Sequence, residues 1–157
     1  MSTSKKAGDL MHGDILVAYE GWTIHRLADF FVRNNISAVP VIASDHQLVG
    51  VVSVSDAFRF NNLDVRNKET ALLNLYRNDF RMEVSEEDLK SWVKDADKTC
   101  TVHQIMTPEV ISVDIDDPVD AVARVLLDKH VHRVFVTEKG SVVGVITAMD
   151  LLSHVYG

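Results

Sequence analysis

Hydrophobic residues recur with the period of a helix at two places in the chain. A spacing of i, i+3, i+4, i+7 and i+8 places such residues on one helical face. One set is Val119, Val122, Ala123, Leu126 and Leu127, and the other is Ile24, Leu27, Ala28, Phe31 and Val32. Because the two sets match position by position, the pattern indicates an internal repeat.

Short runs with strand character flank each predicted helix. They are rich in Val and Ile and are bounded by turn residues, which is typical of short strands. The runs are 15–18, 39–42 and 48–52 in the first copy and 110–113, 134–136 and 142–146 in the second. A closing helix starts at 53–56 and at 147–150. Each copy is therefore predicted to have the order β-α-β-β-α.

The two copies align with an offset of 95 residues at Ile36 and Val131, and of 94 at Gly50 and Gly144. The predicted fold class is α/β (α+β), with the two repeats packed around a pseudo-two-fold axis, because one copy is too small to bury its own faces well. The predicted division is a mobile tail over 1–8, a first repeat over 9–60, a helical insertion over 61–101 and a second repeat over 102–157.

Two helix starts and two further helices are predicted from local signals. Asp117 is expected to cap the helix that has Pro118 in its first turn. Within the insertion, Glu69–Phe80 and Ser85–Asp95 are predicted to be helices, and Ser85 with Asp88 is a plausible capping pair. Trp92 and Val93 are expected to dock the second of these helices on the core.

Composition and charge narrow the classes of partner that the chain is expected to bind. The chain has 157 residues, 46% of them hydrophobic and 25% charged, as in ordinary globular domains. Its net charge of −7 opposes nonspecific binding to nucleic acid or to an anionic membrane. The start is not a signal peptide, no apolar run is long enough for a membrane span, and the one cysteine excludes an intrachain disulfide. We therefore expect a cytoplasmic protein.

The duplicated motifs, in their order, resemble a cystathionine-β-synthase-type (CBS) domain pair, also called a Bateman module. Three pairs of motifs carry the resemblance beside the matched helices. They are 10–11 with 105–108, 36–41 with 131–136, and the closing motifs 50–56 and 144–150. The resemblance covers nearly everything except the tail and the insertion.

The resemblance implies a regulatory module rather than an enzyme. Such pairs commonly bind adenosine-containing ligands in clefts between the repeats and often dimerise into a flat disk. We therefore expect AMP, ADP or ATP as a regulatory ligand, no required cofactor, a homodimer, and a separate effector protein. Mg²⁺ carried by ATP is left open. The alternative is a dimerising interaction module without a nucleotide.

The closing motifs supply the candidate ribose contacts, Ser53 with Asp56 and Thr147 with Asp150. A carboxylate can accept hydrogen bonds from both ribose hydroxyls, and the helix start adds a favourable dipole. The same S/T-x-x-D pattern is also a capping motif, so capping is the competing interpretation.

His132 and Arg133 are the candidate phosphate contacts. An arginine side chain binds phosphate through a planar fork, and the pair resembles the His-Arg pair of AMP-activated protein kinase γ-subunits. An exposed pair at a strand edge is the alternative. The first repeat has Ser37 and Ala38 in these positions, which predicts two unequal clefts.

An apolar slot for adenine is predicted from residues of both repeats: Ile15, Leu16, Ile36, Val110, Ile111 and Val131. These side chains also suit a hydrophobic core. Which repeat's aspartate lies with His132 and Arg133 stays open.

A metal site, a reactive thiol and catalysis by clustered acids are less favoured by the sequence. His130 and His132 have a spacing that metals can use on a strand, but no acidic or cysteine partner lies at a characteristic spacing. Cys100 is expected to be a linker or surface thiol. The acidic cluster Asp114, Asp116, Asp117 and Asp120 falls around a helix start, where carboxylates are stabilising.

Overall fold

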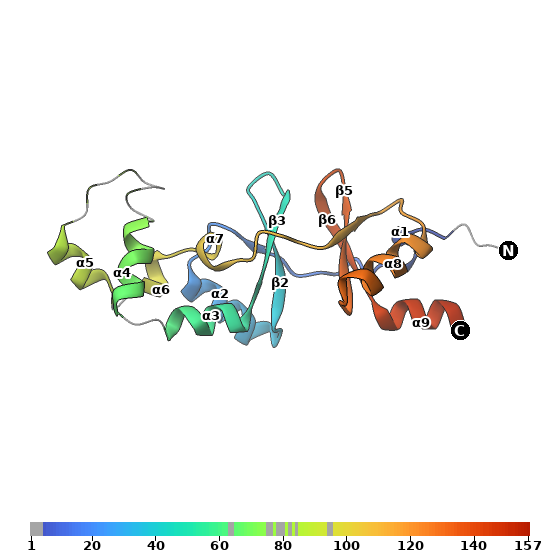
Figure 1. The fold of residues 1–157 in the computed structure, drawn as a ribbon, viewed down its shortest axis with the longest axis horizontal. Helices are drawn as coiled ribbons and strands as arrows, with labels where there is room; N and C mark the ends of the chain where they lie inside the picture. The colour runs from blue at the N-terminus through green and yellow to red at the C-terminus, as the bar shows by residue number, and fades with distance from the viewer. Residues whose placement is uncertain are drawn as a thin grey trace.

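The structure is a computed structural model, and it describes residues 5–62, 65–74, 77, 81, 83, 85–93 and 96–157. Two small sheets stand side by side in the middle of the molecule, and three helices of the insertion lie at one end (Figure 1). In this part of the chain no helix is both long enough and apolar enough to cross a membrane.

The two repeats have the same element order, so the predicted β-α-β-β-α fold is confirmed. The first consists of β1 (Ala18–Tyr19), α2 (Ile24–Asn34), β2 (Ala38–Ile42), β3 (Leu48–Ser53) and α3 (Val54–Asn61). The second consists of β4 (Ser112–Asp114), α8 (Val119–Lys129), β5 (Arg133–Glu138), β6 (Ser141–Thr147) and α9 (Ala148–Tyr156). In each sheet the first strand is parallel to the middle strand, which pairs antiparallel with the third.

Local signals explain where the two long helices begin and end. The Thr23 hydroxyl accepts a hydrogen bond from the Arg26 amide and caps α2, while Asn35 and His130 end α2 and α8 in the left-handed conformation. The prediction that Asp117 caps α8 is wrong. Pro118 occupies the cap position, and the Asp117 carboxylate instead accepts a bond from the Asp114 amide, 2.9 Å away.

The segment before each repeat packs on the other repeat. A short helix, α1 (Ala7–Leu10), lies against the second repeat, where the amides of Ala7 and Gly8 donate to the carbonyls of Asp117 and Ile115. Ala7 is fully buried in the core of that repeat. This differs from the mobile tail expected over residues 1–8, of which residues 1–4 lie outside the described part of the chain.

The reciprocal contact is made by α7 (Val102–Ile105), which precedes the second repeat. Val102 is buried in the core of the first repeat, with Ile105 and Met106 packed against it. Each of these two segments, α1 with the residues up to His12 and α7 with the residues up to Thr107, is called an exchanged segment because it packs on the opposite repeat. Backbone hydrogen bonds hold both exchanged segments in the same way. His12 and Val145 exchange two bonds of 2.9 and 3.0 Å, and Thr107 and Val51 exchange two of 2.8 and 2.9 Å. The chain therefore crosses between the repeats twice.

The insertion forms α4 (Val65–Leu73), α5 (Glu86–Trp92) and α6 (Ala96–Thr99). Ser85 caps α5 as predicted, and Trp92 and Val93 pack against a third apolar cluster. Of the predicted helices, residues 75, 76, 78–80, 94 and 95 lie outside the described residues, and α4 begins four residues before Glu69.

Cys100 is fully buried in that third cluster, so of the two expected settings a surface thiol is wrong, whereas the residue does lie in the insertion that links the repeats. Its backbone explains the burial. The Ile24 amide donates to the Cys100 carbonyl, which draws the end of the insertion onto α2.

The close contact between the exchanged segment and β6 predicts that a side chain at position 144 lowers the stability of the protein. A Cβ atom there would lie 2.5 Å from Met11 Sδ and 2.9 Å from the His12 carbonyl oxygen, which the paired backbone holds in place. We expect Gly144→Ala to lower the free energy of unfolding by about 1–3 kcal/mol. Urea denaturation measures the change.

The matched control is Gly21→Ala, because a Cβ at Gly21 meets no atom within 4 Å. That substitution should cost no more than about 0.5 kcal/mol. Equal stability of the two variants would contradict the close approach of the exchanged segment to β6.

Candidate functional site

A cavity of about 420 Å³ lies between the two sheets. Both crossing segments line it, with Asp14, Ile15 and Leu16 from one and Glu109, Val110 and Ile111 from the other. The remaining wall comes from the sheets and the residues that lead into them: Ile36, Ala38, Val39, Pro40, Val51, Val131, Arg133, Phe135 and Val145. Its volume is in the range of small-molecule pockets, about 300–1,000 Å³.

The lining is pseudo-symmetric, because equivalent positions of the two repeats both line the cavity. Ile36 and Val131 are one such pair, and Pro40 and Phe135 are another. The symmetry fails at one charged position. Arg133 lies where the first repeat has Ala38, so the cation is on one side only.

All six residues of the predicted adenine slot line this one cavity: Ile15, Leu16, Ile36, Val110, Ile111 and Val131. Of the predicted phosphate pair only Arg133 lines it. His132 is exposed and lies outside the lining, and its backbone carbonyl accepts a bond from the Ala148 amide at the start of α9. The six apolar residues of the slot and the Arg133 side chain thus line the same cavity.

The two closing motifs form capping boxes at the starts of α3 and α9. The Asp56 amide donates to the Ser53 hydroxyl, and the Ser53 amide donates to Asp56 Oδ2 at 2.8 Å. Thr147 and Asp150 repeat this arrangement, with the Thr147 amide 2.8 Å from Asp150 Oδ2. Capping is therefore a real role of all four residues, and it uses only one oxygen of each carboxylate.

The second oxygen, Oδ1, contacts a different base in each repeat. Arg59 donates to Asp56 Oδ1 at 2.7 Å from one turn further along α3. Asp150 Oδ1 lies 2.8 Å from Nε2 of His12, which belongs to the exchanged segment. Both bases are mostly exposed, with 64% of the His12 side chain and 74% of the Arg59 side chain accessible.

The surroundings of Asp150 favour its ionised form. Burial on its own raises the pKa of the carboxyl group, whose side chain is 20% exposed. Hydrogen bonds from the Thr147 amide, from His12 and from the Thr147 hydroxyl outweigh that effect and leave the pKa of Asp150 below its ordinary value. Asp150 is thus a carboxylate acceptor at the start of a helix.

Strand register places Arg133 next to the closing motif of its own repeat. Arg133 pairs with Thr147 across β5 and β6, whereas the equivalent pair in the first repeat is Ala38 with Ser53. Arg133 thus lies in the same repeat as Thr147 and Asp150. Which repeat's aspartate shares a cleft with Arg133 stays open.

The sequence did not lead us to predict a role for His12, although its position in the repeat could have indicated one. The offset of 95 aligns His12 with Thr107, directly after the apolar-Met pair of each copy. What the sequence could not show is that this position contacts the opposite repeat. Asp14 and Glu109, equivalent acidic residues of the cavity wall, were missed for the same reason.

His130 does not share a strand with His132. It ends α8 in the left-handed conformation with φ 55°, and β5 starts only at Arg133. Over the described residues there is no group of three or more His, Cys, Asp or Glu side chains placed to hold a metal ion.

The fold defines a class of proteins built from two β-α-β-β-α repeats around a central cavity. The family model of the CBS domain matches residues 7–62 and 102–157, and the chain belongs to this family. The matched ranges include α1 and α7, the exchanged helices.

Individual relatives match this chain over most of its length. The chain is 28% identical over 148 residues to the uncharacterized protein MJ1426 of Methanocaldococcus jannaschii, covering 92% of this chain and 87% of that protein. It resembles the crystal structure of CBSX2, an Arabidopsis thaliana protein, in complex with AMP, with a TM-score of 0.65, 21% identity and 96% of each chain covered.

A second structural neighbour is the CBS domain pair of protein MJ0100 in complex with 5'-methylthioadenosine and S-adenosyl-L-methionine. Its TM-score is 0.59 at 22% identity, covering 99% of this chain and 98% of that one. At these identities the structural likeness establishes the fold.

The capping role of Asp150 predicts a pH-dependent loss of stability. Asp150→Asn should lower the free energy of unfolding by about 1–2 kcal/mol at pH 7, because charge-assisted hydrogen bonds are lost. Since folding lowers the pKa of Asp150, its contribution is complete above about pH 4, the ordinary value for aspartate. The contribution disappears as the pH falls through the lowered native value.

Urea denaturation of wild type and variant between pH 3 and pH 7 measures this difference, with the exposed Asp14 changed to Asn as the matched control. The stability difference for Asp150→Asn should shrink toward low pH. A difference that stays constant to pH 3 would show that ionisation of Asp150 contributes nothing.

Proposed function

We propose that the protein is a regulatory module that binds an adenosine-containing ligand in the cleft of the second repeat. The observation that carries this proposal is the convergence on one cavity of the six apolar residues of the slot and Arg133, in the repeat that also holds Thr147 and Asp150. Similar CBS pairs with bound AMP or with S-adenosyl-L-methionine support the ligand class.

In this arrangement adenine lies between the crossing segments, among Ile15, Leu16, Val110 and Ile111. The ribose hydroxyls donate to Asp150 Oδ1 in place of His12, while Oδ2 continues to cap α9. Arg133 faces the phosphate. The exposed His132 serves a phosphate only from the rim, so Arg133 carries that role.

The charges of the cavity wall favour a ligand with few phosphates. Arg133 is the one cation among the lining residues described, and Asp14 and Glu109 are anions at equivalent places. A monophosphate matches one arginine, whereas a triphosphate places further negative charge near two carboxylates. We infer that AMP is preferred to ADP and ATP.

The first repeat is the weaker site. Ser53 and Asp56 repeat the capping box, but Ala38 replaces the arginine and Arg59 already contacts Asp56 Oδ1. Residues 9–60 and 102–157 are proposed to act as the two repeats and 61–101 as a structured connector. Ligand binding is proposed to bias the relative orientation of the repeats, which a separate effector protein reads.

A homodimer is part of the proposal. Large apolar side chains are exposed on the outer helices of both repeats, which marks an interaction surface. They are Val32 on α2, Phe58 on α3, Leu127 on α8, and Met149, Leu152, Val155 and Tyr156 on α9.

The second candidate is an interaction module that binds no nucleotide. It is favoured by the fact that His12 and Arg59 already occupy the Oδ1 atoms of both aspartates. The two candidates differ in whether any adenosine compound binds the native state.

A thermal-shift panel separates these functions. AMP, ADP, ATP, S-adenosylmethionine and NAD are each added to the full chain, and a ligand that binds the native state raises Tm by mass action. At a hundred times its Kd, AMP should contribute about 2.7 kcal/mol. We expect AMP to give a larger shift than ATP at equal concentration. If none of the compounds raises Tm, the nucleotide proposal is wrong and the interaction module stands.

The same panel tests the role of Arg133. Arg133→Ala should abolish most of the AMP shift but retain a shift with adenosine, because only the phosphate contact is lost. Lys129→Ala removes the same charge from an exposed position at the end of α8, outside the cavity, and should leave both shifts unchanged. Equal losses for AMP and adenosine in Arg133→Ala would contradict a phosphate contact.

A further inference from the structure

One histidine contacts the aspartate oxygen that the proposed ribose contact needs. His12 Nε2 lies 2.8 Å from Asp150 Oδ1, and the two residues are 138 positions apart in sequence. Since an ionised carboxylate only accepts hydrogen bonds, the ring donates from Nε2. A ribose hydroxyl that binds Oδ1 must therefore displace this ring.

The backbone of His12 is fixed, whereas its side chain is open to water. The amide and carbonyl of His12 exchange two hydrogen bonds with Val145 on β6. The side chain is 64% exposed, so water solvates the ring once it leaves the carboxylate. Asp150 is only 20% exposed, and a ribose hydroxyl supplies the donor that replaces the ring. The imidazole can thus swing aside without moving the exchanged segment.

Protonation decides how strongly His12 holds the carboxylate. Histidine changes its charge between about pH 5 and pH 8, and an imidazolium adds a Coulomb attraction to the hydrogen bond. The carboxylate keeps its charge over this range. Burial raises the pKa of Asp150, but its hydrogen bonds outweigh burial and leave that pKa below the ordinary value for aspartate. The charge of His12 is therefore the variable one.

The charged groups around His12 leave Asp150 as its counterpart. In the described part of the chain His12 makes its only ion pair with this aspartate. The strand that its backbone pairs with, β6, has no charged residue. On α9 the other titratable group near this contact is His154, one turn after Asp150. On its own segment Asp9 accepts a backbone bond at the start of α1, and Asp14 lines the cavity.

The equivalent contact of the first repeat does not change with pH in this way. Arg59 holds Asp56 Oδ1 at 2.7 Å, and an arginine side chain stays charged over the whole range. The position equivalent to His12 is Thr107, which has no titratable side chain. Only the aspartate of the second repeat thus has a partner that titrates near neutral pH.

We propose that His12 is a pH-dependent gate on the ligand site, which holds Asp150 Oδ1 when protonated and yields it to a ribose when neutral. This deepens the nucleotide site proposed above and rests on it. Ligand affinity rises with pH between about pH 5 and pH 8, because the competing charge is lost.

Calorimetric titration of adenosine into the full chain tests the gate at about pH 5.5 and pH 8, near the ends of the range in which histidine titrates. Adenosine has the ribose but no phosphate, and a phosphate group would itself titrate at about pH 6. We expect Kd to be about three- to fivefold higher at the lower pH, since a mostly exposed ion pair is a modest competitor.

Two substitutions at position 12 should move the affinity in opposite directions. His12→Ala removes the competitor, so it should bind adenosine equally well at both pH values and more tightly than wild type at the lower one. His12→Arg keeps a permanent charge there, as Arg59 does in the first repeat, and should bind weakly at both. A general loss of stability would weaken both variants, so either variant alone decides if the other fails to fold.

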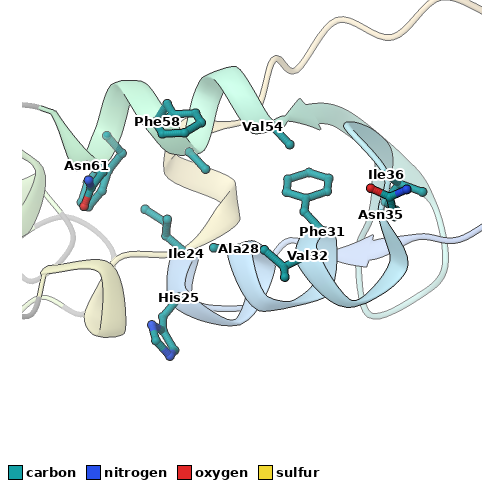
Figure 2. Close-up of a pocket in the computed structure, with 12 residues that line it drawn as sticks. Ile24, His25, Ala28, Phe31, Val32, Asn35, Ile36, Val54, Phe58 and Asn61 are labelled. Carbon is teal, nitrogen blue, oxygen red and sulfur yellow. The ribbon is translucent and has the colours of Figure 1, made fainter.

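Other histidines serve as matched controls. His25 lies on α2 at the groove of about 450 Å³ between α2 and α3, and its ring points away from α3 (Figure 2). His103 belongs to the other exchanged segment, 57% exposed and 4.0 Å from Glu20. Changing His25, His103 or His154 to Ala should preserve the pH dependence of adenosine binding.

Two kinds of failure are distinguishable. Equal wild-type affinity at the two pH values, or a pH dependence that persists in His12→Ala, would overturn the gate and leave the nucleotide site in place. If neither wild type nor His12→Ala binds adenosine or AMP at either pH, the nucleotide site itself is wrong and the gate falls with it.

Discussion

The reciprocal backbone exchange between the repeats is the constraint on which the rest of this structure depends. Two pairs of hydrogen bonds, His12 with Val145 and Thr107 with Val51, add an extra backbone segment to the edge of each sheet. Gly144 and Gly50 allow that approach, because a side chain at either would meet a methionine sulfur and a carbonyl oxygen. Each exchanged helix then completes the opposite core, so neither repeat is a self-sufficient unit.

The cavity follows from the exchange. A chain that begins a repeat on one sheet and continues it on the other must cross the space between them, and it does so twice, at 13–17 and at 108–111. The two crossings bring Ile15 and Val110 into one wall although they are 95 residues apart in sequence. The exchange also carries His12 to Asp150, which gives the second repeat a contact that the first repeat lacks.

Periodicity and duplication predicted the elements, because a helical face and a strand are local properties of sequence. The apolar slot was expected from the resemblance to CBS domain pairs, and its six residues line the cavity between the sheets. The exchange itself was not predictable, because Ala7 and Val102 carry no local mark of the core that buries them. The burial of Cys100 likewise depends on a tertiary contact, the hydrogen bond from α2 to its carbonyl. Asp117 was misassigned because its carboxylate turns back to the Asp114 amide.

The capping boxes show why a site motif can be ambiguous on sequence alone. In Asp56 and Asp150 one carboxylate oxygen caps the helix and the other contacts Arg59 or His12, so the capping interpretation is confirmed and ribose binding stays a prediction. What distinguishes the repeats is Arg133, placed opposite Thr147 where the first repeat has Ala38 opposite Ser53. The module is therefore symmetric in its fold and unequal in its proposed chemistry.

Calorimetric titration of AMP into the full chain tests this inequality most directly, because it counts sites. We expect about one AMP bound per chain, since only the second repeat contributes an arginine, Arg133, to the lining of the cavity. Two equivalent sites per chain would contradict the inequality of the repeats, and no measurable binding would contradict the nucleotide site itself.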